Sequence, residues 1–123
     1  MKKGILIAAL AIMVIAPISA SAATWYKKDL LLPRIGQWNT TARNAVSNTQ
    51  GTYVSKNGHD VVSWIEINNT DEQIGPDRYW DGGNKSPRAQ YHHTGLRGAK
   101  VHASFKSRWY NYMSTHAHVE WAP

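Results

Sequence analysis

Beyond residue 23, apolar and polar residues alternate along many short segments of the chain. Residues 99–107 and residues 114–121 each place a mostly apolar side chain at every second position and polar side chains between them. A period of two is typical of a strand with one buried face and one wet face. We therefore predict two strands near the C-terminus, paired with each other across residues 108–113.

A second pair of strands is predicted in the middle of the chain. Residues 52–56 and 59–67 flank Asn57-Gly58, which is the strongest two-residue hairpin signal because both turn positions require positive φ. Apolar side chains fall on both faces of the second segment, with Val61, Ile65 and Ile67 on one and Val62 and Trp64 on the other. Apolar residues on both faces predict a central strand.

The remaining segments complete an all-β prediction. Residues 25–32 predict a first strand that ends at Pro33, and residues 37–43 are a weaker candidate. Residues 68–98 are rich in turn signals and predict a long loop of the kind that is often functional, with a further strand within it at 89–93. The expected fold is a small antiparallel β-sandwich, or a barrel, of about six or seven short strands.

The N-terminal residues have the pattern of an export signal. Lys2 and Lys3 precede an apolar stretch over residues 5–18, and Ala20-Ser21-Ala22 fits the site that signal peptidase reads. A retained membrane anchor is the alternative, but the stretch is shorter than the roughly 20 residues that span a bilayer. We predict a cleaved signal peptide over residues 1–22 and a single secreted, extracellular β domain over residues 23–123, without a transmembrane segment.

The composition excludes several kinds of chemistry. The chain has no cysteine, which rules out a thiol nucleophile, a cysteine-based zinc site and a redox role. It contains neither Gly-x-Ser-x-Gly nor His-Glu-x-x-His. Asp77 and Asp81 could pair for glycoside cleavage, but they stand among turn residues where aspartate is expected for backbone reasons. We predict that the protein is not an enzyme.

Basic and aromatic residues are concentrated near the C-terminus. Residues 82–119 contain six Lys or Arg residues and no acid, so this region should attract polyanions. The expected partner outside a bacterial cell is an anionic envelope component: a wall polymer, a lipid-linked precursor or a lipid. Export makes nucleic acid a poor candidate. An ordinary solvated surface is the alternative.

Seven residues form the predicted binding site. Four cations would hold phosphate, namely Arg97, Lys100, Lys106 and Arg108. Three aromatic residues would supply stacking or apolar contact, namely Trp109, Tyr110 and Tyr112. The alternative is that these three rings fold back as part of the core.

Three histidines suggest a metal site. His116 and His118 are two residues apart on a predicted strand and therefore point to the same side. His102 lies on the other C-terminal strand, which is expected to pair with the strand of His116 and His118, and its side chain is also expected on the wet face. This arrangement could bind zinc or copper, which makes an extracellular metal-binding module an alternative function.

The layout of the chain resembles that of small secreted lactococcin-like bacteriocins. The shared features are an export signal, a cysteine-free β domain rich in Gly, Ser, Asn and aromatics, and a basic C-terminal half of alternating strands. The final Val119-Glu120-Trp121-Ala122-Pro123 is similar to the end of uncharacterised exported proteins of bacilli. The bacteriocin resemblance implies a β-sandwich that interferes with cell-wall synthesis through its lipid-linked precursor. A self-assembling matrix protein, joined through exposed strand edges, is a further alternative.

Overall fold

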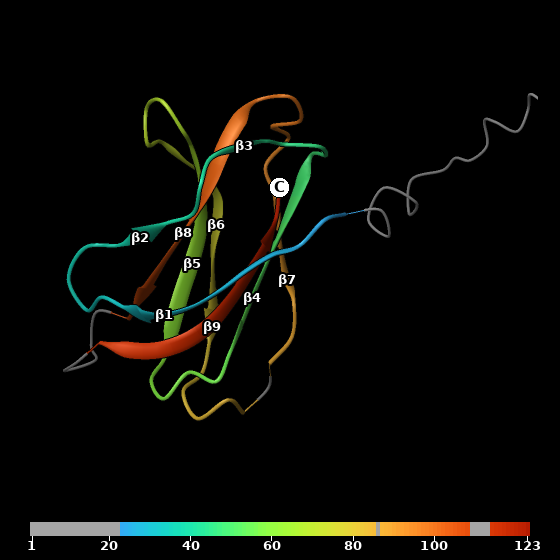
Figure 1. Ribbon diagram of the computed structural model, residues 1–123. Helices are drawn as coiled ribbons and strands as arrows, with labels where there is room; N and C mark the ends of the chain where they lie inside the picture. The colour runs from blue at the N-terminus through green and yellow to red at the C-terminus, as the bar shows by residue number, and fades with distance from the viewer. Residues whose placement is uncertain (1–22, 86, 109–113) are drawn as a thin grey trace, which may run out of the picture.

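The computed structural model describes residues 23–85, 87–108 and 114–123, and the regular structure of these residues is entirely β-strand (Figure 1). The strands are β1 Tyr26–Leu32, β2 Trp38–Asn39, β3 Arg43–Asn44, β4 Thr49–Ser55, β5 Val61–Ile67, β6 Gln73–Trp80, β7 Gln90–His93, β8 Lys100–Ser107 and β9 Thr115–Ala122. Within these ranges the structure contains no helix that is long and apolar enough to cross a membrane.

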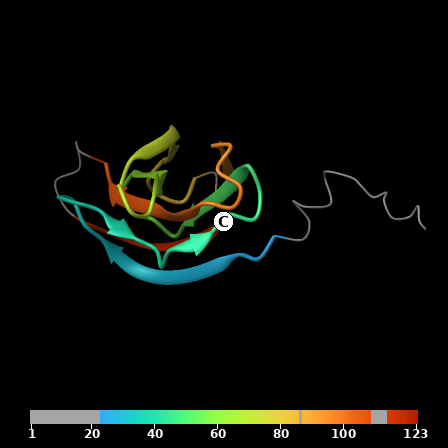
Figure 2. The same cartoon turned by 90° about the horizontal axis from the view of Figure 1, so that it is seen from above.

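The strands form two antiparallel sheets that pack face to face (Figure 2). Sheet A has the order β1-β9-β4-β7, and sheet B has the order β2-β8-β5-β6, with β3 also pairing with β8. The prediction of an all-β fold made of antiparallel strands is confirmed, but the described residues form nine strands rather than the six or seven expected. As predicted, β5 is a central strand, since it pairs with β6 on one side and β8 on the other.

The core lies between the sheets and is built from the alternating positions of β4, β5, β8 and β9. Its fully buried members include Val54, Ile65, Phe105 and Val119. The rings of Trp38 and Phe105 add a tilted aromatic contact with centroids 6.0 Å apart. Burial of these side chains is the main favourable contribution to folding in a chain that has no disulfide.

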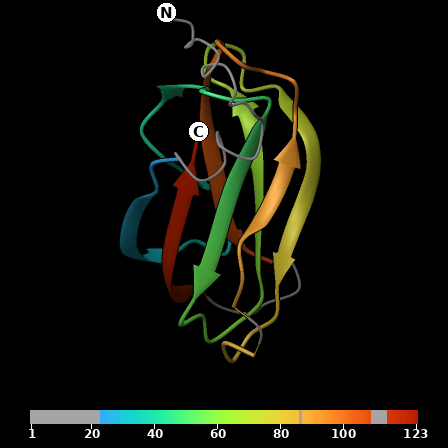
Figure 3. The same ribbon diagram turned by 90° about the vertical axis from the view of Figure 1, so that its right-hand side faces the viewer.

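One flank of the sandwich is closed by β6 and β7, which run side by side in Figure 3 although they belong to different sheets. Arg78 donates from Nε to the carbonyl of Tyr91 at 2.8 Å, and Trp80 donates from Nε1 to the carbonyl of Arg88 at 2.9 Å. The opposite flank lies between β1 of sheet A and β2 and β3 of sheet B.

The predicted hairpin at Asn57-Gly58 is wrong. The strands before and after it, β4 and β5, lie in opposite sheets. Lys56, rather than Asn57 or Gly58, has positive φ, at 56°. The Asn57 side chain is buried and donates to the carbonyls of His59 at 3.1 Å and Asp81 at 3.0 Å. Asn57 therefore stabilises a crossing between sheets through its side chain rather than a tight turn through its backbone.

The predicted pairing of the two C-terminal strands is also wrong. β8 lies in sheet B beside β5, and β9 lies in sheet A between β1 and β4. The predicted buried face of each strand is correct, since Val101, Ala103 and Phe105 on β8 and Ala117 and Val119 on β9 are buried. Alternation specifies which side of a strand faces the core, but it carries no information on the neighbouring strand.

The predicted long loop contains a strand of eight residues. β6 runs through Gly75 and Pro76, which favour turns and obscured the strand. The strand predicted at 89–93 is confirmed as β7, and the weak candidate at 37–43 corresponds to the short strands β2 and β3.

Candidate functional site

A bulge in β6 shapes the outer face of sheet B. Ser63 of β5 pairs with Arg78 of β6 and Ile65 pairs with Ile74, so the single residue Trp64 lies opposite three residues of β6. Gly75 permits this irregularity because its φ of 84° is unfavourable for other residues. Bulges bend an edge strand and redirect its side chains, and they are frequent next to functional sites.

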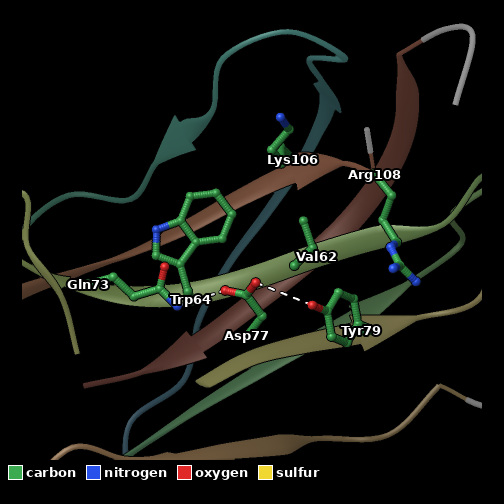
Figure 4. Close-up of a pocket in the computed structure, with 7 residues that line it drawn as sticks. All are labelled: Val62, Trp64, Gln73, Asp77, Tyr79, Lys106 and Arg108. Carbon is green, nitrogen blue, oxygen red and sulfur yellow. Dashed lines mark hydrogen bonds between the residues drawn. The ribbon is translucent and has the colours of Figure 1, made fainter. Parts of the chain in front are cut away.

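An open depression of about 260 Å³ lies over this irregular part of the sheet (Figure 4). Its walls come from three neighbouring strands and from the residue after β8. The lining residues are Val62, Trp64, Gln73, Asp77, Tyr79, Lys106 and Arg108. The register explains why they meet, since Val62 lies opposite both Tyr79 and Lys106 in its two neighbouring strands.

The depression combines aromatic surface with both signs of charge. The guanidinium of Arg108 lies over the Tyr79 ring at 4.2 Å from the centroid, a cation–π contact. Asp77 accepts from Gln73 Nε2 at 2.7 Å and from the Tyr79 hydroxyl at 3.3 Å (Figure 4). The site therefore offers ring faces for stacking, a carboxylate that accepts hydrogen bonds and two cations that attract anions.

A cluster of buried polar side chains lies next to the depression on the same face of sheet B. Glu66 of β5 and His102 of β8 are register partners, and Oε1 of the first lies 2.8 Å from Nε2 of the second. His102 Nδ1 contacts Asn68 Oδ1 at 3.0 Å, and Gln37 reaches over the sheet to donate to Glu66 Oε2 at 3.1 Å. Glu66 and His102 are buried even though they lie on the outer side of the sheet, whereas Asn68 is half-buried and Gln37 is exposed.

Trp64 belongs to both the depression and the buried cluster. Its indole Nε1 donates to Glu66 Oε2 at 2.6 Å. Burial alone would raise the pKa of Glu66, but the hydrogen bonds from Trp64, Gln37 and His102 outweigh burial and leave this pKa below its ordinary value. An ionised Glu66 thus holds the indole in place at the edge of the depression.

The structure brings together only two of the four predicted cations. Lys106 and Arg108 line the depression. Lys100 is exposed at the other end of β8, about 20 Å along the strand. Arg97 is exposed in the preceding loop, where its backbone N–H donates to Asn48. The predicted contacts from Trp109, Tyr110 and Tyr112 fall outside the described residues.

The three predicted metal ligands do not share a site. His102 is buried in sheet B, whereas His116 and His118 lie on β9 in sheet A. His118 is held between two carboxylates, with Nε2 at 2.8 Å from Glu120 and Nδ1 at 2.7 Å from Asp29. The expected arrangement of the three histidines required β8 to pair with β9. Because these strands lie in different sheets, the arrangement does not form.

A different group of residues could hold a metal ion. Glu66, Asp71 and His102 each offer one ligand atom, and these atoms lie within 4.8 Å of one another. Asp71 is exposed and lies 3.9 Å from His102 Nε2. The contact between His102 Nδ1 and Asn68 resembles the outer-shell hydrogen bond that usually orients a ligating imidazole.

Four polar or aromatic residues of the depression were not predicted as binding residues: Trp64, Gln73, Asp77 and Tyr79. Trp64 was assigned to an apolar face of β5, which is the face that carries the depression. The others lie in β6, which was not predicted. The alternation of Asp77 and Tyr79 with Arg78 and Trp80 is the signal that could have revealed them.

The fold and the site define an all-β protein of two packed sheets with an aromatic, charged depression on one outer face. No protein-family model matches the chain, and no curated protein or solved structure matches it significantly.

Proposed function

We propose that the protein is a secreted, bacteriocin-like binding module that engages an anionic saccharide polymer of the bacterial envelope through the depression on sheet B. In this proposal residues 1–22 are the cleaved export signal, and the protein acts by binding rather than by catalysis. The observation that carries the proposal is the convergence of Trp64, Tyr79, Lys106 and Arg108 on one open concave surface.

The chemistry of the depression suits a sugar that carries acidic groups. Aromatic faces stack on the apolar faces of sugar rings, and sugar hydroxyls need both donors and acceptors. Gln73 and Asp77 supply these polar groups at one wall of the depression, while Lys106 and Arg108 supply positive charge at another. An open site on the face of a sheet can admit a polymer, because the chain can enter and leave at either end.

Calorimetric titration with a purified wall polysaccharide that contains uronic acids tests the proposal. We expect saturable binding that weakens as salt is added, since exposed charges are screened. Tyr79→Ala and Lys106→Gln should each weaken binding about tenfold, which corresponds to about 1.4 kcal/mol. Unchanged binding at low salt after Lys106→Ala together with Arg108→Ala would show that the depression is not the site.

The chain provides a matched control for the aromatic variant. Tyr91 is 47% exposed and Tyr79 is 45% exposed, but Tyr91 lies on β7 in sheet A. Tyr91→Ala removes the same chemical group from the other sheet, so it should leave the affinity unchanged. Equal losses in both tyrosine variants would indicate non-specific adsorption.

Growth inhibition tests the antibacterial part of the proposal. The chain from Ala23 onward is applied to lawns of several Gram-positive species. Zones of inhibition that are narrow in species range and that shrink in Tyr79→Ala support an antibacterial binder. Full binding of the polymer without inhibition of any strain would restrict the function to binding.

Metal binding is a second candidate function, favoured by the proximity of Glu66, Asp71 and His102. Zinc or copper bound at this cluster should raise the melting temperature of the folded chain. Asp71→Asn should abolish this stabilisation without disturbing the fold, because the Asp71 side chain is exposed and asparagine tolerates the positive φ of 57° at this position. Stabilisation that survives in Asp71→Asn but disappears in His116→Ala with His118→Ala would place the metal on sheet A instead.

A further inference from the structure

The flank formed by β1 of sheet A and by β2 and β3 of sheet B lies on the opposite side of the sandwich from β6 and β7 (Figure 3). A cleft of about 240 Å³ lies on this flank. The residues that line it are Tyr26, Lys27, Lys28, Trp38, Thr40, Thr41, Arg43, Val119 and Trp121. Three of the nine are cations, and none of these nine described residues is acidic. The depression on sheet B differs in this respect, because it includes Asp77.

Two of the cations approach the cleft from opposite sheets on the core-facing sides of their strands. Lys28 pairs with the buried Val119, and Arg43 pairs with the buried Val101. Side chains of directly paired residues point to the same side of a sheet. Lys28 and Arg43 therefore both extend toward the space between the sheets at its open flank.

The environment of Arg43 leaves its charge without an acidic partner among the described residues. Its guanidinium lies 3.5 Å from the centroid of the Tyr26 ring, and its Nε is buried without a hydrogen bond to the described part of the chain. Lys28, which is exposed, and the half-buried Arg43 both add positive charge to the same cleft. A cleft lined by like charges attracts an ion of the opposite sign.

Two threonines add hydroxyl donors at the same place. Thr40 accepts from the backbone N–H of Ala103 at 3.0 Å through its Oγ1, so its own hydroxyl proton can be donated elsewhere. Thr41 is exposed beside it. Guanidinium, ammonium and hydroxyl donors together match the several oxygens of a phosphate group. The half-buried ring of Trp38 provides an apolar surface for the group that carries the phosphate, whereas Trp121 belongs to the buried core.

We propose that this flank cleft is a phosphate-binding site, in which Lys28 and Arg43 neutralise the charge and Thr40 and Thr41 donate hydrogen bonds. The phosphate could belong to a phosphodiester polymer of the wall or to a phospholipid headgroup, and both sources share the chemistry that the cleft recognises. The inference stands apart from the proposed function, because it concerns different residues on a different side of the sandwich.

Chemical-shift changes of the backbone amides during titration with inorganic phosphate test this site. Ionic strength is held constant with chloride. We expect saturable shifts at Thr40, Thr41 and Arg43, with a dissociation constant of about 1 mM. Lys28→Gln should weaken binding about tenfold, whereas Lys85→Gln, which removes the same charge from an exposed position in the loop between β6 and β7, should leave it unchanged.

Arg43→Gln has a matched control in Arg34→Gln, since Arg34 is exposed in the loop between β1 and β2. Loss of the phosphate response in the first variant but not in the second supports the site. If Arg43→Gln does not fold, Lys28→Gln still decides the question. Shifts that do not saturate, or that fall equally in Lys28→Gln and Lys85→Gln, would overturn the proposal.

Two further titrations distinguish the sources of phosphate. Glycerol phosphate polymer and vesicles of phosphatidylglycerol are each added to wild type and to Lys28→Gln. A Lys28-dependent response to the polymer supports a wall phosphodiester, and one to the vesicles supports a lipid headgroup. A response to neither, with inorganic phosphate also inactive, would contradict a phosphate site while leaving the depression on sheet B to its own test.

Discussion

The indole of Trp64 and the carboxylate of Glu66 are joined by a hydrogen bond of 2.6 Å on the outer face of β5. The two residues are two positions apart, so their side chains emerge on the same side of the sheet. Trp64 lines the depression, whereas Glu66 is buried beside His102 under Gln37. The orientation of a ring offered to a ligand therefore depends on a buried carboxylate that the ligand does not touch.

Glu66→Gln should weaken both the fold and the binding of wall polymer. Loss of the charged acceptor should lower the free energy of unfolding at pH 7 by about 2 kcal/mol. The depressed pKa of Glu66 stabilises the folded state above its ordinary value of 4.5, and this stability is lost as the pH falls through the folded-state value. Urea unfolding at several pH values should thus show a shallower acid dependence in the variant.

Glu72→Gln is the control for this prediction, because Glu72 is exposed nearby in the sequence. An identical acid dependence in wild type and Glu66→Gln would show that the carboxylate contributes nothing as an ion.

His92 should make the protein sensitive to mild acid. Burial lowers its pKa from 6.5 to about 4, despite the carbonyl of Pro76, which accepts from Nδ1 at 3.2 Å. Between these two pH values the unfolded chain binds a proton that the folded chain does not, so stability falls with falling pH by at most about 3 kcal/mol. His92→Gln should be less stable at pH 7 but should lose less stability on going to pH 4.5. Equal losses in both proteins would contradict a buried neutral imidazole.

His118 should make the folded protein more stable at mildly acidic pH than at alkaline pH, which is the opposite of the effect of His92. The hydrogen bond to Glu120 raises its pKa, burial opposes this, and Asp29 raises the pKa further. A raised histidine pKa stabilises the folded state below pH 6.5, and the stability is lost as the pH rises through the folded-state value. Because Asp29 is exposed, we expect only about 0.5 kcal/mol. Unfolding midpoints between pH 6 and pH 8.5 should decline in wild type and in His116→Gln, but not in His118→Gln.

Asn57→Gly distinguishes the observed structure from the hairpin that the sequence suggests. In a type I′ turn glycine would be tolerated at this position. In the observed fold it removes two hydrogen bonds from a buried amide to the carbonyls of His59 and Asp81. We expect a loss of about 1–3 kcal/mol in the free energy of unfolding. A variant as stable as wild type would favour the tight turn.

The sequence was sufficient to predict the strands whose side chains alternate, because alternation reflects burial directly. It was insufficient for the strand order, since the sequences that join β4 to β5 and β8 to β9 are short enough to be interpreted as hairpin connections. The composition of the site was only partly predictable for the same reason. Lys106 and Arg108 were predicted as binding residues. Their aromatic neighbours Trp64 and Tyr79 lie on other strands, and the alternation of side chains does not reveal which strands are paired.

His102 shows how the same limit affected the predicted metal site. Its position in an alternating segment predicted a wet side chain beside His116. In the structure, Gln37 and Asn68 cover the outer face of β8 at this point, and His102 is buried against Glu66. A segment from elsewhere in the chain can cover the outer face of a sheet. The alternation of apolar and polar residues in the covered strand does not indicate this burial.

The position of β9 in sheet A determines when the protein can fold. It is the last strand of the chain, yet it lies between β1 and β4 and pairs with both. Among the described strands β1 pairs only with β9, so sheet A cannot be completed before β9 has been synthesised. The contact between Asp29 and His118 joins residues 89 positions apart in the sequence, and pairing of strands over such a separation is intrinsically slow.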